Sequence, residues 1–524
     1  MVTGKTLLPF ALALSLTASD RVQTDKGAVE GNTSADSTVH IFKGIPFAAP
    51  PVGSLRWKAP QPAASWAGVR KTVEFTPRCM QTLVFPDMVF RDQGPSEDCL
   101  YLNVWTPASS ASAKLPVMVW IYGGGFVAGA ASEARQDGEQ LAKKGVVVVS
   151  MNYRLGVFGF FSHPDLAKES GHDSSGNYGL LDQLAALQWV HNNIAAFGGD
   201  PGKVTLFGES AGSFSVSALM ASPLAQGLFH RAIGESGAFF GSTLGLKPLA
   251  DTEKADQKFI DAIGVPSLEA LREMPANKLL EAASKQSLLR FSPNIDGYFM
   301  PEDAASIYAA GKQSHVPLLA GWNADEGSFR SFFGKKDPTS QNYAELIHTR
   351  YAEHADKILK LYPAGNDDQA KRSAQDLSGD QFIAYSTWKW IEMQVATAKT
   401  PVFRYEFDQA PPAEHSADAT DGSSISPGAY HSAEIEFVFE ALPSKQLPWR
   451  PQDTKLSDLM SSYWSNFAKT ADPNGPGLPK WPVYSAADQY PVMHLSTNSH
   501  AAPDEHRARY EFLDKTKSAA ASGL

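Results

Sequence analysis

Residues 203–212 read Lys-Val-Thr-Leu-Phe-Gly-Glu-Ser-Ala-Gly, and this stretch decides the fold. Its first five residues have the apolar, β-rich character of a buried strand, and the residues after Ser210 are small and compatible with a helix. A serine between two glycines at such a junction predicts a sharp strand-to-helix turn, because the backbone crowds the positions two residues to either side. Ser210 is therefore a candidate nucleophile whose hydroxyl stands clear of the sheet.

The rest of the chain alternates between strand-like and helical stretches. The short apolar runs are residues 117–122, 146–152, 204–207, 232–235, 317–321 and 402–407. Segments such as 180–195 lie between them and are compatible with helices. This alternation predicts an α/β fold with a central, mostly parallel sheet flanked by helices. In such folds the functional residues lie on loops at the carboxyl ends of the strands.

The length of 524 residues exceeds that of a typical domain, but no Pro/Gly/Ser-rich linker divides the chain. We therefore expect one large domain over residues 20–513. The tail of residues 514–524 is rich in lysine, alanine and serine, which predicts that it is frayed and disordered. A net charge of −10 without a basic cluster argues against nucleic acid as a partner.

The N-terminus carries a pattern typical of export. Lys5 precedes an apolar run at residues 7–16, which is too short to span a bilayer, and small residues follow at 17–19. This pattern predicts a signal peptide over residues 1–19 and a secreted or periplasmic protein without a membrane span. The alternative is a loosely packed N-terminal extension.

The chain has two cysteines, Cys79 and Cys99, and neither lies near companions at metal-ligand spacing. In an exported chain they would most simply form one disulfide. In a cytosolic protein they would be two buried thiols. The sequence therefore predicts no metal site at these positions.

Ester hydrolysis by a serine needs a base, a carboxylate that orients the base, and N–H donors for the oxyanion. Three glycines, Gly123 to Gly125, directly follow the strand-like run 117–122. Glycine backbone can approach a substrate oxygen closely, so we expect the N–H groups of Gly124, Gly125 and Ala211 to form an oxyanion hole. The alternative is a plain glycine turn.

The base and its carboxylate should follow the serine in the order acid, then histidine. Asp325 and Glu326 follow the strand-like run 317–321, where either could orient the base or both could belong to a solvated acidic turn. His431 lies in a loop that enters an apolar segment, whereas His230 lies too close to the nucleophile. Position alone does not choose among the 13 histidines.

With these residues assembled, the chain resembles the type-B carboxylesterase family, a group of α/β-hydrolases that includes carboxylesterases and cholinesterases. The resemblance covers residues from about 22 to 513. Its longest motifs are residues 42–48 (Phe-Lys-Gly-Ile-Pro-Phe-Ala), 96–104 (Ser-Glu-Asp-Cys-Leu-Tyr-Leu-Asn-Val) and 176–183 (Gly-Asn-Tyr-Gly-Leu-Leu-Asp-Gln), with shorter ones at 50–53, 152–156 and 197–201. The resemblance implies the α/β-hydrolase fold with insertions around an active-site gorge.

The resemblance also implies roles for individual residues. Ser210, Glu326 and His431 become the catalytic triad. The implied network behind the histidine consists of Glu209, Glu434 and Ser236, for which the alternative is a purely structural hydrogen-bonded cluster. The other implied features are a Cys79–Cys99 disulfide and two buried ion pairs, Arg56–Glu97 and Arg154–Asp182.

The implied activity is that of a serine carboxylic-ester hydrolase. Such an enzyme acts through an acyl-enzyme on small to medium alkyl or aryl esters, with water and without metal or cofactor. Residues 80–98 contain no tryptophan, which argues against choline esters, and Ser432 stands where glycine is frequent in the family.

Two alternatives stay open. An enzyme specialised for feruloyl, galloyl or polyester substrates would suit the apolar residues Phe85, Met88, Phe90 and Phe126, if they line the pocket. A catalytically inactive adhesion module would usually lack a triad member. Neither the physiological ester nor the oligomeric state is specified by these residues.

Overall fold

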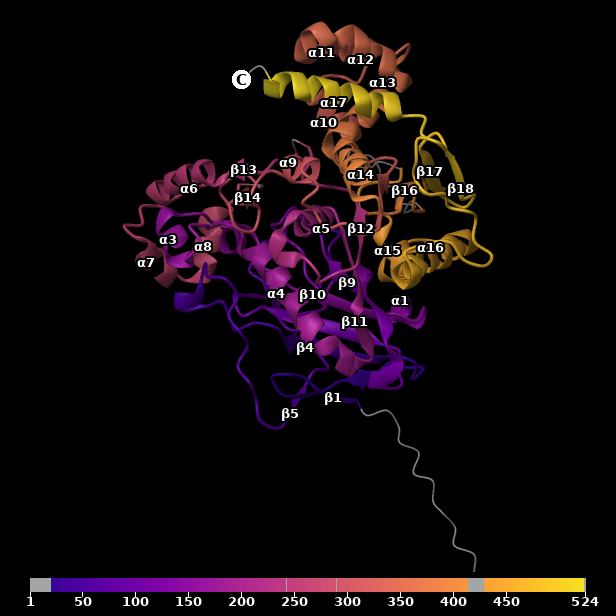
Figure 1. Ribbon diagram of the computed structural model, residues 1–524. Helices are drawn as coiled ribbons and strands as arrows, with labels where there is room; N and C mark the ends of the chain where they lie inside the picture. The colour runs from indigo at the N-terminus through magenta and orange to yellow at the C-terminus, as the bar shows by residue number, and fades with distance from the viewer. Residues whose placement is uncertain (1–19, 242, 289, 413–427, 523–524) are drawn as a thin grey trace, which may run out of the picture.

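The computed structural model describes residues 20–241, 243–288, 290–412 and 428–522 (Figure 1). The predicted signal peptide, residues 1–19, lies outside the described residues. Within the described ranges, no helix combines the length and apolar character needed to cross a membrane.

An 11-stranded sheet forms the centre of the protein, in the order β18-β17-β16-β15-β12-β11-β9-β10-β8-β4-β3. The strands that pair in parallel are β10 (Val147–Met151), β9 (Leu115–Ile121), β11 (Gly199–Glu209), β12 (Arg231–Glu235), β15 (Leu318–Asn323), β16 (Val402–Phe407) and β17 (Pro491–Leu495). Antiparallel strands continue the sheet at both edges: β8 (Tyr101–Thr106), β4 (His40–Pro46) and β3 (Asn32–Thr33) at one, β18 (His500–Pro503) at the other. The predicted α/β architecture with a mostly parallel sheet is confirmed.

Helices cover both faces of this sheet, as two neighbouring residues of β12 show. A Cβ added at Gly234 would meet Trp390 of α14 (Tyr385–Ala398) and Ser213 of α5 (Ala211–Ala221). The next side chain, Glu235, instead accepts a hydrogen bond from Trp464 of α16 (Pro451–Thr470). Successive strand residues point to opposite faces, so α5 and α14 lie on one face and α16 on the other.

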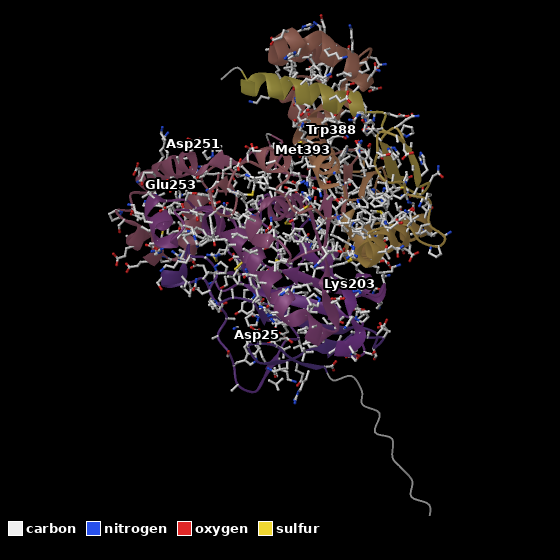
Figure 2. All side chains as sticks on the ribbon, viewed as in Figure 1. Asp25, Lys203, Asp251, Glu253, Trp388 and Met393 are labelled. Carbon is white, nitrogen blue, oxygen red and sulfur yellow. A yellow bond between two sulfur atoms is a disulfide. The ribbon has the colours of Figure 1, made fainter. Side chains whose placement is uncertain are left out.

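Burial on both faces explains why the central strands are apolar along their whole length. Every residue of β10 is buried, as are the last five residues of β9. The side chains drawn in Figure 2 fill the space between the sheet and its helices. The helix α4 (Tyr178–Asn193) also lies where the sequence predicts one.

A second, smaller layer of helices forms its own hydrophobic core, and these helices lie together at the top of Figure 1. They are α10 (Phe329–Phe333), α11 (Ser340–Tyr351), α12 (Ala355–Leu361) and α13 (Asp367–Gly379), beside α17 (Arg507–Ser522). A single-turn π-helix, η7 (Asp380–Ala384), connects α13 to α14.

Helix α17 extends to Ser522, into the segment from residue 514 whose composition predicts a frayed tail. Its Asp514 accepts hydrogen bonds of 2.9 Å from both Tyr385 Oη and Lys389 Nζ of α14. These contacts hold the first residue of that segment against α14.

The remaining elements surround the central layers. The helices are α1 (Glu139–Lys143), α2 (Gly156–Phe160), α3 (Pro164–Ser170), α6 (Leu249–Ile263), α7 (Leu268–Glu273), α8 (Ala276–Ala283), α9 (Ala304–Ala309) and α15 (Ile435–Val438). The strands are β1 (Arg21–Gln23), β2 (Ala28–Glu30), β5 (Val69–Lys71), β6 (Arg78–Cys79), β7 (Pro95–Ser96), β13 (Lys247–Pro248) and β14 (Asn294–Ile295).

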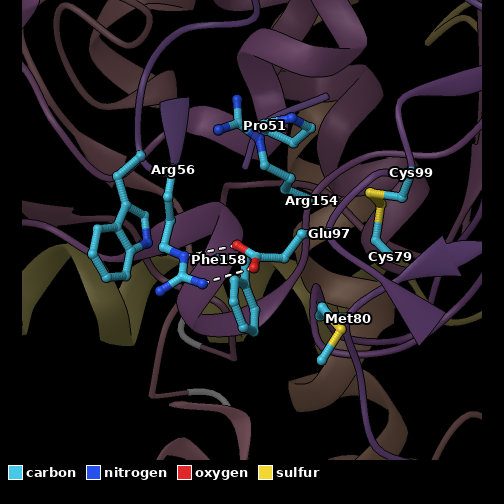
Figure 3. Close-up of a pocket in the computed structure, with 9 residues that line it drawn as sticks. Pro51, Arg56, Cys79, Met80, Glu97, Cys99, Arg154 and Phe158 are labelled. Atoms are coloured by element: carbon cyan, nitrogen blue, oxygen red, sulfur yellow. Dashed lines mark hydrogen bonds and ion pairs between the residues drawn. A yellow bond between two sulfur atoms is a disulfide. The ribbon is translucent and has the colours of Figure 1, made fainter. Parts of the chain in front are cut away.

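The cysteines form the disulfide that the resemblance implies, and both are buried. Figure 3 shows this bridge beside the ion pair between Arg56 and Glu97, whose Nη2 and Oε2 atoms lie 2.7 Å apart. The second implied ion pair is also formed, with 2.7 Å between Arg154 Nη2 and Asp182 Oδ1.

Candidate active site

Ser210 occupies the turn between β11 and α5 with φ 53° and ψ −122°, a conformation that non-glycine residues rarely adopt. The end of strand β9 packs closely against this turn. A Cβ added at Gly212 would lie 1.9 Å from the Ile121 carbonyl oxygen, and one at Gly208 would lie 2.6 Å from the same atom. Both flanking glycines are therefore required by close backbone packing.

A chain of two hydrogen bonds connects Ser210 to a buried carboxylate. His431 Nε2 lies 2.9 Å from Ser210 Oγ, and His431 Nδ1 lies 2.6 Å from Glu326 Oε2. A carboxylate only accepts, so the Nδ1–H donates to Glu326 and leaves Nε2 free to accept the serine hydroxyl. The imidazole is 28% exposed and the Glu326 side chain 1%, so a ligand can reach the base but not the acid.

The structure brings Glu326, not Asp325, to the histidine. Glu326 Oε1 accepts hydrogen bonds from Ser236 Oγ at 2.5 Å and from the Asn323 backbone N–H at 2.9 Å, which fix the carboxylate. Asp325 points away and accepts from the Ala429 N–H, at 2.8 Å. Asp325 therefore holds the loop that carries His431, and of these two adjacent carboxylates only Glu326 contacts the imidazole.

The glycine loop after β9 lies directly beside the serine. A Cβ added at Gly123 would lie 2.9 Å from Ser210 Cβ, and Gly124 and Gly125 have φ values of 110° and 62°. Within the described part of the chain, the Gly124, Gly125 and Ala211 N–H groups donate none of the loop hydrogen bonds. Free N–H donors next to a nucleophile are what an oxyanion hole requires.

Further carboxylates surround the imidazole from the buried side. Glu209 Oε1 lies 3.4 Å from His431 Nε2, and Glu434 Oε2 accepts a hydrogen bond of 2.6 Å from Asn323 Nδ2. Burial raises the pKa of Glu209 and that of Glu434, and the positive charge that His431 can carry opposes this rise at both carboxyl groups. Ser236 donates to Glu326, so Glu209, Glu434 and Ser236 lie in one buried polar cluster at the imidazole.

Glu235 joins this buried group, although sequence reasoning missed it. Its Oε1 accepts a hydrogen bond of 2.7 Å from Trp464 Nε1, and burial raises its pKa well above the ordinary range. The available signal was an acidic residue at the end of an apolar strand, directly before Ser236.

The electrostatics of His431 reflect these neighbours. Burial by itself lowers the pKa of the imidazole, but the negative charges of Glu326 and Glu209 and the hydrogen bond to Glu326 outweigh it. The net effect raises the pKa of His431 above its ordinary value. The site therefore favours the positively charged imidazolium, the form that a general base reaches after it takes a proton.

The four apolar residues proposed as a pocket rim have different surroundings in the structure. Phe126 is fully buried and packs against Phe160 and Phe239, so it belongs to the core rather than to an open rim. Phe90 lies under the Arg78 guanidinium, 4.8 Å from it. Met88 is the one found beside the glycine loop, with its Cε 3.1 Å from a Cβ added at Gly124, and Phe85 is half-buried. Contacts between residues that are distant in the sequence decide where each of these side chains lies, and the sequence does not show these contacts.

The described residues contain no group of three or more histidine, cysteine or acidic side chains arranged to hold a metal ion. The arrangement around Ser210 has the geometry required of a nucleophile, a base with an orienting carboxylate, and oxyanion donors. These are the components of acyl transfer through a serine.

Comparison with known proteins agrees with this chemistry. The model of the carboxylesterase family matches residues 18–513. Fumonisin B1 esterase of Sphingopyxis macrogoltabida is 37% identical over 88% of this chain and 84% of its own, and carboxylesterase 1D of Rattus norvegicus is 38% identical over 91% and 90%. A solved structure of a PNB esterase is 33% identical, has a TM-score of 0.79, and covers 94% of this chain and 99% of its own. Because the match extends over nearly the whole chain in sequence and in fold, this protein belongs to the carboxylesterase family.

Proposed function

We propose that the protein hydrolyses small to medium alkyl or aryl carboxylic esters, with Ser210 as nucleophile, His431 as base and Glu326 as its orienting acid. The observation that carries the proposal is the continuous chain Ser210 Oγ–His431 Nε2 at 2.9 Å and His431 Nδ1–Glu326 Oε2 at 2.6 Å. The chain starts at a strained turn that exposes the hydroxyl and ends at a buried carboxylate.

Acylation begins when Ser210 Oγ attacks the ester carbonyl carbon and its proton passes to His431 Nε2. The negative charge on the carbonyl oxygen is stabilised by the N–H groups of Gly124, Gly125 and Ala211. The bond to the alcohol oxygen then breaks, and Nε2 gives its proton to the departing alcohol. The acyl group remains on Ser210 Oγ.

Deacylation repeats these steps with water. His431 Nε2 takes a proton from a water molecule, whose oxygen attacks the acyl carbon. The bond to Ser210 Oγ breaks, the serine recovers its proton, and the carboxylic acid leaves. In both half-reactions Glu326 keeps the imidazole oriented, and the charge of Glu209 stabilises the imidazolium.

The decisive experiment is Ser210→Ala. Turnover of p-nitrophenyl acetate should fall by about 10⁴-fold or more, and labelling by a fluorophosphonate probe should disappear, while circular dichroism stays parental. Ser217→Ala, another buried serine on α5, is the matched control and should keep both labelling and turnover. Turnover near the parental rate in Ser210→Ala would refute the proposal. An adhesion module without catalysis would show no labelling in the parent.

We also propose that the protein is exported. The predicted signal peptide at residues 1–19 supports this, and so does the Cys79–Cys99 disulfide, because disulfides persist in oxidising compartments. The test is the intact mass of the protein from the exported and the cytoplasmic fractions. Loss of the first residues in the exported fraction supports export, and full-length protein confined to the cytoplasm contradicts it.

A further inference from the structure

An aromatic side chain outside the triad flanks the candidate base. The ring of Phe382 lies 5.2 Å from the His431 imidazole, centre to centre, with an angle of 68° between the rings. Phe382 is 36% exposed, and it is the only aromatic residue among the large hydrophobic side chains that stay exposed in the described ranges. An exposed phenylalanine in contact with a reactive imidazole indicates a surface that a ligand covers.

The backbone that presents Phe382 is unusual. Phe382 lies within η7, and π-helical turns are rare and frequently occur at functional sites. The turn is fixed from within the fold, because Tyr362 Oη donates to Asp380 Oδ2 at 2.6 Å. The residue directly before this turn, Gly379, packs closely against the loop that follows Glu326. A Cβ added at Gly327 would lie 2.2 Å from the Gly379 nitrogen. Phe382 is thus held next to His431 by a rigid element.

The chemistry of the proposed reaction tells which half of an ester meets this ring. In acylation His431 Nε2 must pass its proton to the oxygen of the departing alcohol. The alcohol half therefore lies on the imidazole side of Ser210, while the carbonyl oxygen points to the glycine loop. A side chain that flanks the exposed imidazole faces the alcohol half.

We propose that Phe382 is a specificity-determining residue that favours apolar, and above all aromatic, alcohol groups. This inference rests on the function proposed above. An aromatic alcohol can pack against the phenyl ring edge-to-face or offset, and it removes the exposed ring from water. A short alkyl alcohol covers too little of the ring to gain the same contact.

The test separates the two halves of the substrate in the variants Phe382→Ala and Phe382→Leu. One series varies the alcohol of acetate esters from methyl through benzyl to 1-naphthyl. A second series varies the acyl chain of p-nitrophenyl esters. We expect Phe382→Ala to lower kcat/KM for benzyl and naphthyl acetates about 10-fold more than for methyl acetate, with Phe382→Leu intermediate. The relative preference along the acyl series should remain parental.

A pre-steady-state measurement distinguishes specificity from damage to the base. Acetate esters of different alcohols share one acetyl-enzyme, and the alcohol has left before this intermediate is hydrolysed. The rate of acetyl-enzyme hydrolysis should therefore be unchanged in Phe382→Ala. A lower rate would mean that the ring orients His431, and it would overturn the proposal, as would an equal loss for all alcohols.

Val395 provides the matched control, because it is an exposed hydrophobic residue on α14, the helix that follows η7. Val395→Ala should leave both series unchanged. Fluorophosphonate labelling of the parent separates the two hypotheses. Labelled Ser210 without any change in alcohol preference refutes only the role of Phe382, whereas absence of labelling refutes the proposed function itself.

Discussion

Arg135 Nη1 donates a hydrogen bond of 3.1 Å to Ser432 Oγ, the side chain directly after His431. Ser432 has φ 69°, in the left-handed region that favours glycine. Arg135 is buried in the 3₁₀ turn η3 (Ala134–Gln136), which follows the glycine loop, and its Nε lies 2.5 Å from Glu133 Oε1. The bond therefore connects the loop that carries His431 to the segment that follows the glycine loop of Gly124 and Gly125.

This relationship predicts losses of different size for two substitutions of Ser432. Ser432→Ala keeps the strained backbone but loses the bond, so kcat should fall about 5-fold with KM little changed. Ser432→Gly also loses the bond, but glycine adopts this φ without strain, so kcat should stay closer to the parental value. Steady-state kinetics on p-nitrophenyl acetate measure both. A parental kcat in Ser432→Ala would contradict a positioning role of the bond, and equal kcat values in the two variants would show that backbone strain at residue 432 has no effect on the reaction.

The charge of Glu209 should appear in the pH dependence of the reaction. That charge raises the pKa of His431, and the amide of Glu209→Gln cannot do so. The pKa of His431 is therefore lower in the variant. Its imidazole then stays neutral down to a lower pH, and only the neutral imidazole can accept the serine proton. The acid limb of kcat/KM against pH should move to lower pH.

The same substitution should lower kcat, because the imidazolium loses a stabilising charge in the transition state. Glu302→Gln, which removes a carboxylate from an exposed pair with Lys312, is the control and should leave the profile unchanged. An acid limb that stays in place or moves upward in Glu209→Gln would exclude this electrostatic role.

The glycine after the nucleophile should be intolerant of any side chain. In Gly212→Ala the new Cβ would lie 1.9 Å from the Ile121 carbonyl oxygen, and neither backbone can yield without moving β9 or α5. We expect a loss of about 3 kcal/mol in the free energy of unfolding, measured by urea denaturation. In Gly202→Ala the Cβ would meet only the Asp200 side chain, at 3.2 Å, and stability should stay close to parental. Similar losses in both variants would be inconsistent with a steric requirement at the turn.

The buried ion pair between Arg154 and Asp182 should matter for stability rather than chemistry. Their side chains are 3% and 0% exposed, and Asp182 Oδ2 also accepts the Arg154 backbone N–H at 3.0 Å. Asp182→Asn leaves a buried guanidinium without its counter-charge, so the free energy of unfolding should fall by about 3–5 kcal/mol. Asp165→Asn breaks an exposed pair with Lys168 and should change little. A small effect of Asp182→Asn would show that water or nearby groups compensate the arginine.

Local patterns in the sequence were sufficient for the nucleophile turn and for the fold class. The turn at Ser210 is marked by the glycines two positions to either side of the serine, so the residue types signal it, although the strand that crowds those glycines, β9, is distant in the sequence. The parallel sheet follows from strands that are apolar on both faces, another local property. The resemblance to a known family then named Glu326 and His431 from motifs, where position alone left Asp325 and the other histidines open.

Tertiary structure alone decided which side chains meet. His431 lies 221 residues from Ser210 and 105 from Glu326, and no local pattern encodes the approach of loops so far apart. The same reason explains why Glu235, Arg135 and Phe382 escaped the sequence. Each is defined by a partner on another element: the indole of Trp464, the hydroxyl of Ser432 and the imidazole of His431. The sequence by itself determined the reactive turn and the sheet that carries it, whereas packing between distant segments decided what surrounds the base.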